Sequence, residues 1–311
     1  MTTYVARRLL QSLIVLVGVT LLVYVLLFQT GDPAFLSVGT DATLADVEAA
    51  RRALGYDRPF YAQYATFLLG ALRGDLGTSL RQGQPVVGLI VERLPATLEL
   101  TFAALGIALA VAVPVGILSA TRRNSWLDHA AMLGALLGQS VPVFFLGIIL
   151  LWFFGGQLGW FPIGGRGDGS LASEVRHLAL PALTLAAFST ARHARLMRSN
   201  LLEVLRQDYV RTAWAKGLRE RAVVLRHAVK NALIPIVTVV GLEFGTLLGG
   251  AVVTETVFAW PGVGSLVVRA VGQKDFPVVV GAVTLLSFLF VLLNLVVDLL
   301  YGFLDPRIRY A

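Results

Sequence analysis

Six apolar runs dominate the sequence and constrain its fold more than any other feature. They lie at about 9–28, 98–120, 128–154, 178–190, 233–256 and 277–303. A helix needs roughly 20 predominantly apolar residues to cross a bilayer, and all but the fourth run reach that length. Hydrophobic residues make up 56% of the 311 residues and charged residues 14%, a composition typical of polytopic membrane proteins. The sequence therefore predicts an all-α integral membrane protein with six transmembrane helices.

Lys and Arg residues between the runs predict the orientation. Of the 26 basic residues, 16 lie in four places: near the N-terminus, in the loop after the second run, in the segment 192–232 and near the C-terminus. These four places would lie on the same side of the membrane. Short cytoplasmic loops are enriched in Lys and Arg, so both termini are expected in the cytoplasm. The first run is too long for a secretory signal and lacks a small-x-small cleavage site, so it is read as a retained span.

Three regions follow from this topology. Residues 1–29 form an N-terminal transmembrane helix, 30–97 an external segment, and 98–311 a core of five transmembrane helices with a cytoplasmic loop at about 201–232. Within the external segment, a surface helix is expected over 41–54, with Gly55 as the residue that stops it. Two interpretations of this segment stay open: a small helical cap on the external mouth, or a platform that receives a delivery protein.

The sequence carries none of the common enzyme motifs. It contains no cysteine, no GxxxxGK[ST] phosphate-binding loop, no GxSxG elbow and no histidine pair at metal-binding spacing. The chain is therefore expected to be no enzyme and to bind no metal or cofactor, and a membrane hydrolase is a weak alternative. The basic surplus lies beside the membrane spans, so the lipid bilayer, and not nucleic acid, is the expected partner of these charges.

A few polar residues and one proline interrupt the apolar runs. Candidates for a translocation path are Gln139, Ser140, Pro142, Glu243 and Glu255. Carboxylates within a membrane are costly and therefore functional candidates, although Glu243 and Asp298 could also pair with neighbours to fix helix packing, the favoured interpretation for Asp298. Pro142 is expected to kink the third helix. His193 and Arg195 are expected at or beyond the lipid boundary unless they line a polar cavity.

The segment 192–232 concentrates the charge of the chain. It holds ten Lys and Arg against three acids, a surplus of +7 that equals the net charge of the whole chain. Its run 208–218 predicts a short helix stopped by Gly217, and a second helix is expected from Arg219 to the next span. Ala213 and Gly217 are i, i+4 neighbours that would leave a narrow strip of backbone uncovered, a shape suited to a partner's cleft. The alternative is an amphipathic helix resting on anionic headgroups.

A series of motifs along nearly the whole chain resembles one family. In order they are Gly31-Asp32-Pro33, Leu54-Gly55-Tyr56-Asp57-Arg58-Pro59, Gly74-Asp75-Leu76-Gly77-Thr78-Ser79, Pro95-Ala96-Thr97-Leu98-Glu99-Leu100, the run 209–217, Arg226-His227-Ala228-Val229-Lys230-Asn231 leading to Pro235, Glu255-Thr256-Val257-Phe258, Trp260-Pro261-Gly262-Val263-Gly264, and Asp305-Pro306-Arg307. In this order they are similar to the permease subunits of binding-protein-dependent ABC importers, in particular the B-type subunit of dipeptide and oligopeptide permeases.

The resemblance implies a multi-pass location in the bacterial plasma (inner) membrane, a type I ABC importer permease fold and an EAA-type loop that couples the spans to an ATPase. The coupling-loop residues would be Asp208, Tyr209, Arg211, Thr212, Ala213, Lys216, Gly217 and Leu218. Arg211-Thr212 stands where the general consensus has Glu-Ala, and Pro235 lies further from Gly217 than the consensus proline, two departures that look like the peptide subfamily.

The resemblance also implies the partners and the mechanism. These are a sister C-type permease in a heterodimer, two ABC ATPase subunits that bind the ATP and Mg, and an external peptide-binding protein. Transport would proceed by alternating access, with a short peptide as the expected substrate, although nickel, glutathione and oligosaccharide importers share this permease type. The alternative from another class is a secondary transporter or channel driven by an ion gradient through Glu243 and Asp298.

Overall fold

The computed structural model describes the backbone of residues 2–29, 34–35, 38 and 42–304, and the side chains of 7–27, 34–35, 38 and 42–296. The motifs at 31–33 and 305–307 lie outside the described residues, as does the side chain of Asp298. In the described part every regular element is a helix, and only an isolated bridge joins Thr78 to Pro85. The chain divides into two compact units, Met1–Thr97 with Pro261–Ala311, and Leu98–Trp260. The predicted core 98–311 is thus spread over both units.

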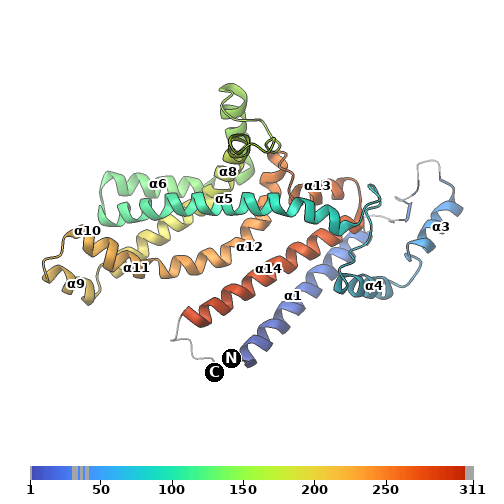
Figure 1. Cartoon of the computed structure of the whole chain (residues 1–311), viewed down its shortest axis with the longest axis horizontal. Coiled ribbons are helices and arrows are strands. Elements are labelled where there is room, and N and C mark those ends of the chain that lie inside the picture. Colours follow the sequence, from blue (N-terminus) through green and yellow to red (C-terminus); the bar gives the residue numbers. More distant parts are fainter. Residues whose placement is uncertain (1, 30–33, 36–37, 39–41, 305–311) are drawn as a thin grey trace. The chain divides into compact units, whose positions relative to one another are not determined.

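The first unit is built around two long helices from opposite ends of the chain. Its helices are α1 (Thr2–Gln29), α3 (Leu44–Ala53), α4 (Phe60–Leu72), α13 (Val263–Gly272) and α14 (Phe276–Leu304). α1 and α14 run side by side, and α13 packs on α14 (Figure 1). Its largest cluster of buried side chains consists of Leu76, Val86, Leu89, Ile90, Val263, Leu266, Ala270, Val278, Val279 and Ala282. Burial of this apolar surface joins residues 76–90 to α13 and α14.

The predicted surface helix over 41–54 is present as α3 but begins later. Thr43 caps it, since its side chain accepts a hydrogen bond from the Asp46 backbone and the Asp46 carboxylate accepts one from the Thr43 backbone. This reciprocal capping box satisfies donors that a helix start leaves free. Gly55 follows with φ +73, the left-handed conformation expected of a residue that stops a helix.

The second unit holds the remaining helices. α5 (Val86–Thr121) passes from the first unit into it, and the chain continues with α6 (Trp126–Ser140), α7 (Val143–Leu150), the π-helical η1 (Leu151–Gln157), α8 (Leu171–Val204), α9 (Asp208–Ala215), α10 (Glu220–Ala222), the π-helical η2 (Val223–Ala228), α11 (Val229–Ala232) and α12 (Ile234–Val257). α8 contacts α6, α7, α11 and α12. It is therefore the central helix of this unit.

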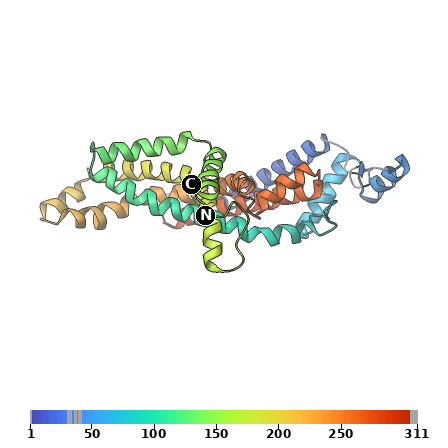
Figure 2. The same cartoon turned by 90° about the horizontal axis from the view of Figure 1, so that it is seen from above.

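The predicted third span is broken and not merely kinked. The helices on either side of Pro142 meet at 103°, and the chain turns sharply after α6 (Figure 2). Pro142 has no backbone N–H and adopts φ −58 and ψ 135, outside the helical region, so it ends one helix and begins the next. Val141 is extended as well, which completes the break.

The described residues contain four helices long and apolar enough to cross a membrane, or five if the bent pair around Pro142 counts as one span. The four lie within α1, α5, α12 and α14, in agreement with the predicted runs 9–28, 98–120, 233–256 and 277–303. The predicted fourth span, 178–190, lies in the 34-residue α8, which is not among the helices long and apolar enough to cross a membrane. The six-span count is therefore not reached on these criteria.

Candidate coupling surface

The loop between α8 and α12 begins with a tight turn at the end of α8. The backbone N–H groups of Leu205, Arg206 and Gln207 donate to carbonyls of the last turn of α8, and Gln207 then adopts the extended conformation that starts α9. At the other end, Gly217 has φ +73 and its N–H donates to the carbonyl of Trp214. This left-handed glycine ends α9 after two turns, as the sequence predicts.

The inner face of α9 anchors it to α8. Val210 and Ala213 of α9 are buried together with Val223 of η2, and Val204 and Leu205 at the end of α8 pack against them. The expectation that Ala213 and Gly217 leave an uncovered strip is wrong for Ala213, which is only 6% exposed. The small Ala213 side chain is covered by the loop's own core, so α9 is held on α8 by packing.

The outer face of α9 is left open. Tyr209 and Trp214 are each 44% exposed and Leu218 is 39% exposed, among the exposed charges Arg211 and Lys216. The Tyr209 hydroxyl accepts a hydrogen bond from the Asn231 side chain at 2.7 Å, which ties α9 to the end of α11. Exposed aromatic side chains framed by charges are typical of protein interfaces, so this face has the character of a docking surface.

A second core supports the base of the loop. Its buried residues come from α5, α8, η2, α11 and α12, and they are Ala120, Met197, Leu201, Val224, Ala228, Val229, Ala232 and Ile236. Gly116 of α5 allows a close approach here, since a Cβ atom at this position would stand 2.5 Å from the Cβ of Met197. In Figures 1 and 2, α9 and α10 form the end of this unit, next to the point where α8 ends and α12 begins.

A buried ion pair connects α6 with α8 near the loop. The guanidinium of Arg198 donates to both oxygens of Asp128, at 2.7 and 2.8 Å. The same carboxylate accepts from the Ser119 hydroxyl and from the Asn124 backbone N–H. Sequence reasoning missed this pair, because it treated Asp128 only as the beginning of an apolar run. The N-cap Ser125 three residues earlier is the local signal that places Asp128 in a first helical turn.

A second polar cluster lies between α8 and α12. His193 is fully buried and Glu243 is 3% exposed, and His193 Nε2 lies 3.1 Å from Glu243 Oε2. The Ser189 hydroxyl donates to the other carboxylate oxygen at 2.7 Å. The sequence offered two positions for His193, the lipid boundary or polar surroundings within the protein. The structure shows polar surroundings, since the side chains of Glu243 and Ser189 lie beside it. Glu243 is a member of a paired cluster and does not face lipid alone.

Comparisons with known proteins show the family of the chain. A family model described as the inner membrane component of binding-protein-dependent transport systems matches residues 112–310, and the model of its N-terminal part matches residues 1–101. The chain belongs to this family. The dipeptide transport system permease protein DppB of Alkalihalophilus pseudofirmus is 40% identical over 100% of both chains, and the glutathione transport system permease protein GsiC of Pectobacterium atrosepticum is 45% identical over the same share.

A third relative of this permease is the probable D,D-dipeptide transport system permease protein DdpB of Escherichia coli, 47% identical over 89% of this chain and 88% of that protein. Among solved structures, a chain of the methionine ABC transporter MetNI in an inward-facing conformation has a TM-score of 0.58 at 20% identity. That match covers 70% of this permease and 96% of the other chain, which supports the expected ABC importer permease fold.

The five predicted path residues of this permease are not gathered in one place. Gln139 accepts a hydrogen bond from the Arg195 guanidinium, while Ser140 is exposed and donates to the Leu136 carbonyl. Pro142 is exposed at the break between α6 and α7. Glu255 is fully buried on α12. It is twelve residues from Glu243 on the same helix, or roughly 18 Å along the helix axis at 1.5 Å per residue.

The described residues contain no group of three or more His, Asp or Glu side chains that could hold a metal ion. The polar clusters of this permease are instead pairs and triads that join helices. Asp128 with Arg198 joins α6 to α8, and Glu243 with Ser189 and His193 joins α12 to α8. Together with the apolar core at Met197, they attach three neighbouring helices to the half of α8 that carries the loop.

Proposed function

We propose that the chain is one permease subunit of an ATP-driven importer for short peptides. It pairs with a sister permease of the C type, two ABC ATPase subunits supply the ATP hydrolysis and bind the Mg, and an external solute-binding protein delivers the peptide. Relatives named for dipeptides, D,D-dipeptides, oligopeptides and glutathione support this substrate class, because each of these compounds is a short peptide. The chain itself carries no catalytic group in this proposal.

The attachment of α9 to α8 is the observation that carries the mechanism. Val210 and Ala213 pack against the last turn of α8, so a force applied to the exposed face of α9 is transmitted to a rigid helix of 34 residues. Interiors are close-packed, so such a displacement is passed on and not absorbed. α8 in turn carries the contacts to α5, α6 and α12. Closure of the ATPases would thereby shift four helices and open the path on one side of the membrane and then on the other.

The coupling-loop residues keep their predicted role within this proposal, with Ala213 as an anchor and Tyr209, Trp214, Gly217 and Leu218 on the docking face. The loop then lies in the cytoplasm, where ATP is available. This requires both termini on the cytoplasmic side and residues 30–97 outside. The five path residues remain a prediction, in which Gln139, Ser140 and Pro142 belong to the break in the third span.

The test is transport by the reconstituted assembly. The permease is assembled in liposomes with a C-type permease, two ABC ATPases and a solute-binding protein from the same organism, and uptake of a labelled dipeptide is measured with ATP on the ATPase side. We expect uptake that needs both ATP and the binding protein and that persists when an ionophore collapses the proton gradient. Uptake that continues without ATP and follows the proton gradient would instead establish the ion-driven alternative.

A further inference from the structure

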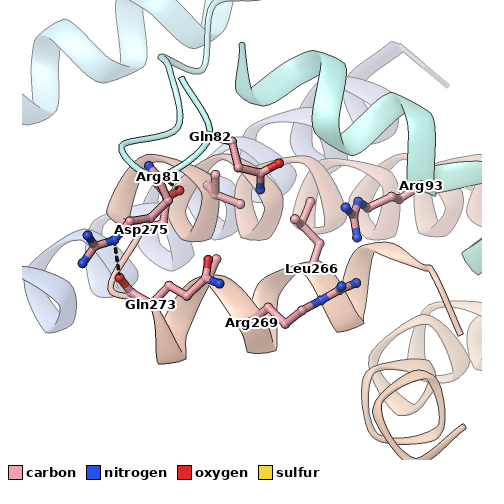
Figure 3. Close-up of a pocket in the computed structure, with 9 residues that line it drawn as sticks. Arg81, Gln82, Arg93, Leu266, Arg269, Gln273 and Asp275 are labelled. Atoms are coloured by element: carbon pink, nitrogen blue, oxygen red, sulfur yellow. Dashed lines mark hydrogen bonds between the residues drawn. The ribbon is translucent and has the colours of Figure 1, made fainter. Parts of the chain in front are cut away.

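A cationic pocket lies in the first unit. It has a volume of about 470 Å³ and is formed by the loop before α5, the first turns of α5, α13 and the start of α14 (Figure 3). Its polar lining consists of Arg81, Gln82, Arg93, Arg269, Gln273 and Asp275. Three guanidinium groups against one carboxylate give it a net positive charge. None of the residues assigned to coupling or to the path belongs to it.

Two of the arginines face each other at one end of the pocket. In Figure 3 the side chain of Arg93 from α5 and that of Arg269 from α13 point toward one another. The Nε atom of Arg93 is buried without a hydrogen-bond partner. Arg269 is held in place by Ser265, whose backbone carbonyl and hydroxyl oxygens each accept from it at 3.2 Å. Two like charges are thus held together with a buried donor left unused, an arrangement that an anion between them would stabilise.

The single carboxylate of the pocket does not neutralise these arginines. Asp275 is 1% exposed, and its oxygens accept from the Ser79 hydroxyl and from the backbone N–H groups of Leu80 and Arg81, at 3.1 and 3.4 Å for the two N–H groups. Among the described residues, no carboxylate lies within 4 Å of the guanidinium of Arg81, Arg93 or Arg269. Asp275 therefore serves to hold the loop at 79–81.

The loop held by Asp275 places the third arginine. The Nε group of Arg81 donates to the Gln273 backbone carbonyl at 3.0 Å, which leaves its terminal nitrogens for another acceptor. A planar guanidinium matches a carboxylate through two parallel hydrogen bonds, and its position here is fixed before any ligand arrives. The amides of Gln82 and Gln273 line the pocket beside it. The volume exceeds that of one carboxylate group and suits an acidic side chain with the chain segment that carries it.

The position of the pocket bears on the source of this carboxylate. α5 has 36 residues, about 54 Å in length, whereas the hydrocarbon core of a bilayer is about 30 Å thick, so one end of α5 projects beyond it. The pocket lies at the N-terminal end of α5, next to the segment proposed to be external. The family is described as part of binding-protein-dependent transport systems, and in the proposed function the solute-binding protein docks on that side.

We propose that this pocket receives an aspartate or glutamate side chain of the external solute-binding protein when that protein docks. The inference rests on the proposed function, which supplies the partner. Arg93 and Arg269 bind the carboxylate, and Arg81 with the two glutamines contacts the adjoining segment. Desolvated charge pairs of this kind set which partner is accepted and in which orientation.

The experiment measures the affinity of the purified binding protein for the whole importer in nanodiscs of neutral lipid. We expect Arg93→Gln and Arg269→Gln each to raise the Kd at least about tenfold, as loss of a close charge pair does. Arg269→Lys keeps the charge and loses the two-point geometry, so its Kd is expected between those of Arg269→Gln and the wild type. Arg73→Gln is the matched control, because Arg73 is exposed in the same segment and does not line the pocket, and we expect less than about a twofold change.

Acidic residues on the binding protein's surface are then replaced one at a time by arginine and combined with Arg269→Glu. Recovery of binding in one pair would identify the docked side chain. Equal affinity of the wild type and the two glutamine variants would overturn the inference while wild-type uptake still supports the proposed function. A rise in Kd that appears only in nanodiscs of anionic lipid would also overturn the inference, because it would assign the pocket to a headgroup phosphate. A raised KM for peptide uptake, with an unchanged Kd of the binding protein for the importer, would overturn it too, because the pocket would then bind the peptide's own carboxylate.

Discussion

His193 Nε2 lies 3.1 Å from Glu243 Oε2, and the two side chains are buried between α8 and α12. The other ring nitrogen, Nδ1, is 2.8 Å from the Ser189 carbonyl oxygen, which can only accept, so Nδ1 carries a hydrogen. Neither His193 Nε2 nor Glu243 Oε2 has a hydrogen-bond partner elsewhere among the described residues, and both atoms are buried. Each atom therefore depends on the other for polar contact.

Removal of either partner should destabilise this unit. A buried polar group left without its partner costs about 1–3 kcal/mol, so Glu243→Ala and His193→Ala should each lower the thermal midpoint of the purified permease complex. The double variant should lose less than the sum of the two, because it leaves neither polar group without its partner. Glu99→Ala is the control, since Glu99 forms a partly exposed pair with Arg166 that contributes about 1 kcal/mol or less. Strictly additive losses would show that His193 and Glu243 do not interact.

Variants of the carboxylates Glu243 and Asp298 distinguish ATP-driven transport from transport driven by a proton gradient. If ATP drives transport, Glu243→Gln and Asp298→Asn should leave dipeptide uptake insensitive to an ionophore, and any loss of uptake should follow a loss of assembled complex. The amide of Glu243→Gln keeps the size of the side chain but cannot carry a transported proton. Uptake per assembled complex is the quantity to measure. A specific loss of proton-dependent uptake in Glu243→Gln would support the ion-driven alternative.

Features that depend on neighbouring residues in the chain were predictable from the sequence. α3 with its Gly55 stop and α9 with its Gly217 stop both depend on cap chemistry and a left-handed glycine, which act over a few residues. Four of the apolar runs appear as helices of membrane-spanning length for the same reason. These elements are specified by local propensity and by the length of the apolar run.

Features that join distant segments were not predictable from the sequence. Ser189 and Glu243 are 54 positions apart, and nothing local indicates that α8 and α12 bring them together. The burial of Ala213 depends on Val223 and on the end of α8, so helical spacing alone assigned this side chain to the wrong face. Pro142 shows that the geometry of a single apolar run is also only partly predictable from its sequence. A proline predicts an interruption, but the 103° bend also requires an extended Val141, which the sequence does not signal.

Reporter fusions test the orientation directly. Fusions after Ala311 and within the loop at 122–125 should report the cytoplasm, and a fusion near Gly83 should report the exterior. The basis is the excess of Lys and Arg, 16 of 26, on the proposed cytoplasmic side. Alkaline phosphatase and fluorescent protein fusions at each site give opposite readouts and control for each other. An external C-terminus would contradict this orientation, because it would place the coupling loop outside the cell, where no ATP is available.

The ion pair of Asp128 and Arg198 should matter for coupling. Asp128→Asn keeps the shape of the side chain but removes the charge that accepts two hydrogen bonds from Arg198, a loss of about 2 kcal/mol. We expect a complex that still assembles but whose ATPase activity responds less to the loaded binding protein, because α6 no longer moves with α8. Arg198→Lys retains the charge without the two-point geometry and should give an intermediate response. Full stimulation in Asp128→Asn would show that the pair only stabilises the fold.

Two variants of Gly217 test the docking face of α9, because one adds only backbone strain and the other also adds a large side chain. A Cβ atom at Gly217 would meet open space, so Gly217→Ala adds only the strain of a left-handed residue, about 1 kcal/mol. Gly217→Leu adds the same strain and fills the surface that we propose enters the ATPase. We therefore expect Gly217→Ala to keep most of the co-purified ATPase and Gly217→Leu to lose most of it, with normal insertion and normal pairing with the sister permease.

Two controls distinguish docking from the alternatives. Gly159→Leu introduces a leucine at another left-handed glycine in open space, φ +62, and should leave the ATPase bound. Arg219→Gln and Arg221→Gln remove charges that would attract a helix to anionic headgroups, each contributing about 1 kcal/mol, and should have small effects. If α9 rests on the membrane surface, the order reverses, and the two arginine variants become more severe than Gly217→Leu. Normal ATPase content and normal coupling in Gly217→Leu would exclude this face as the docking surface.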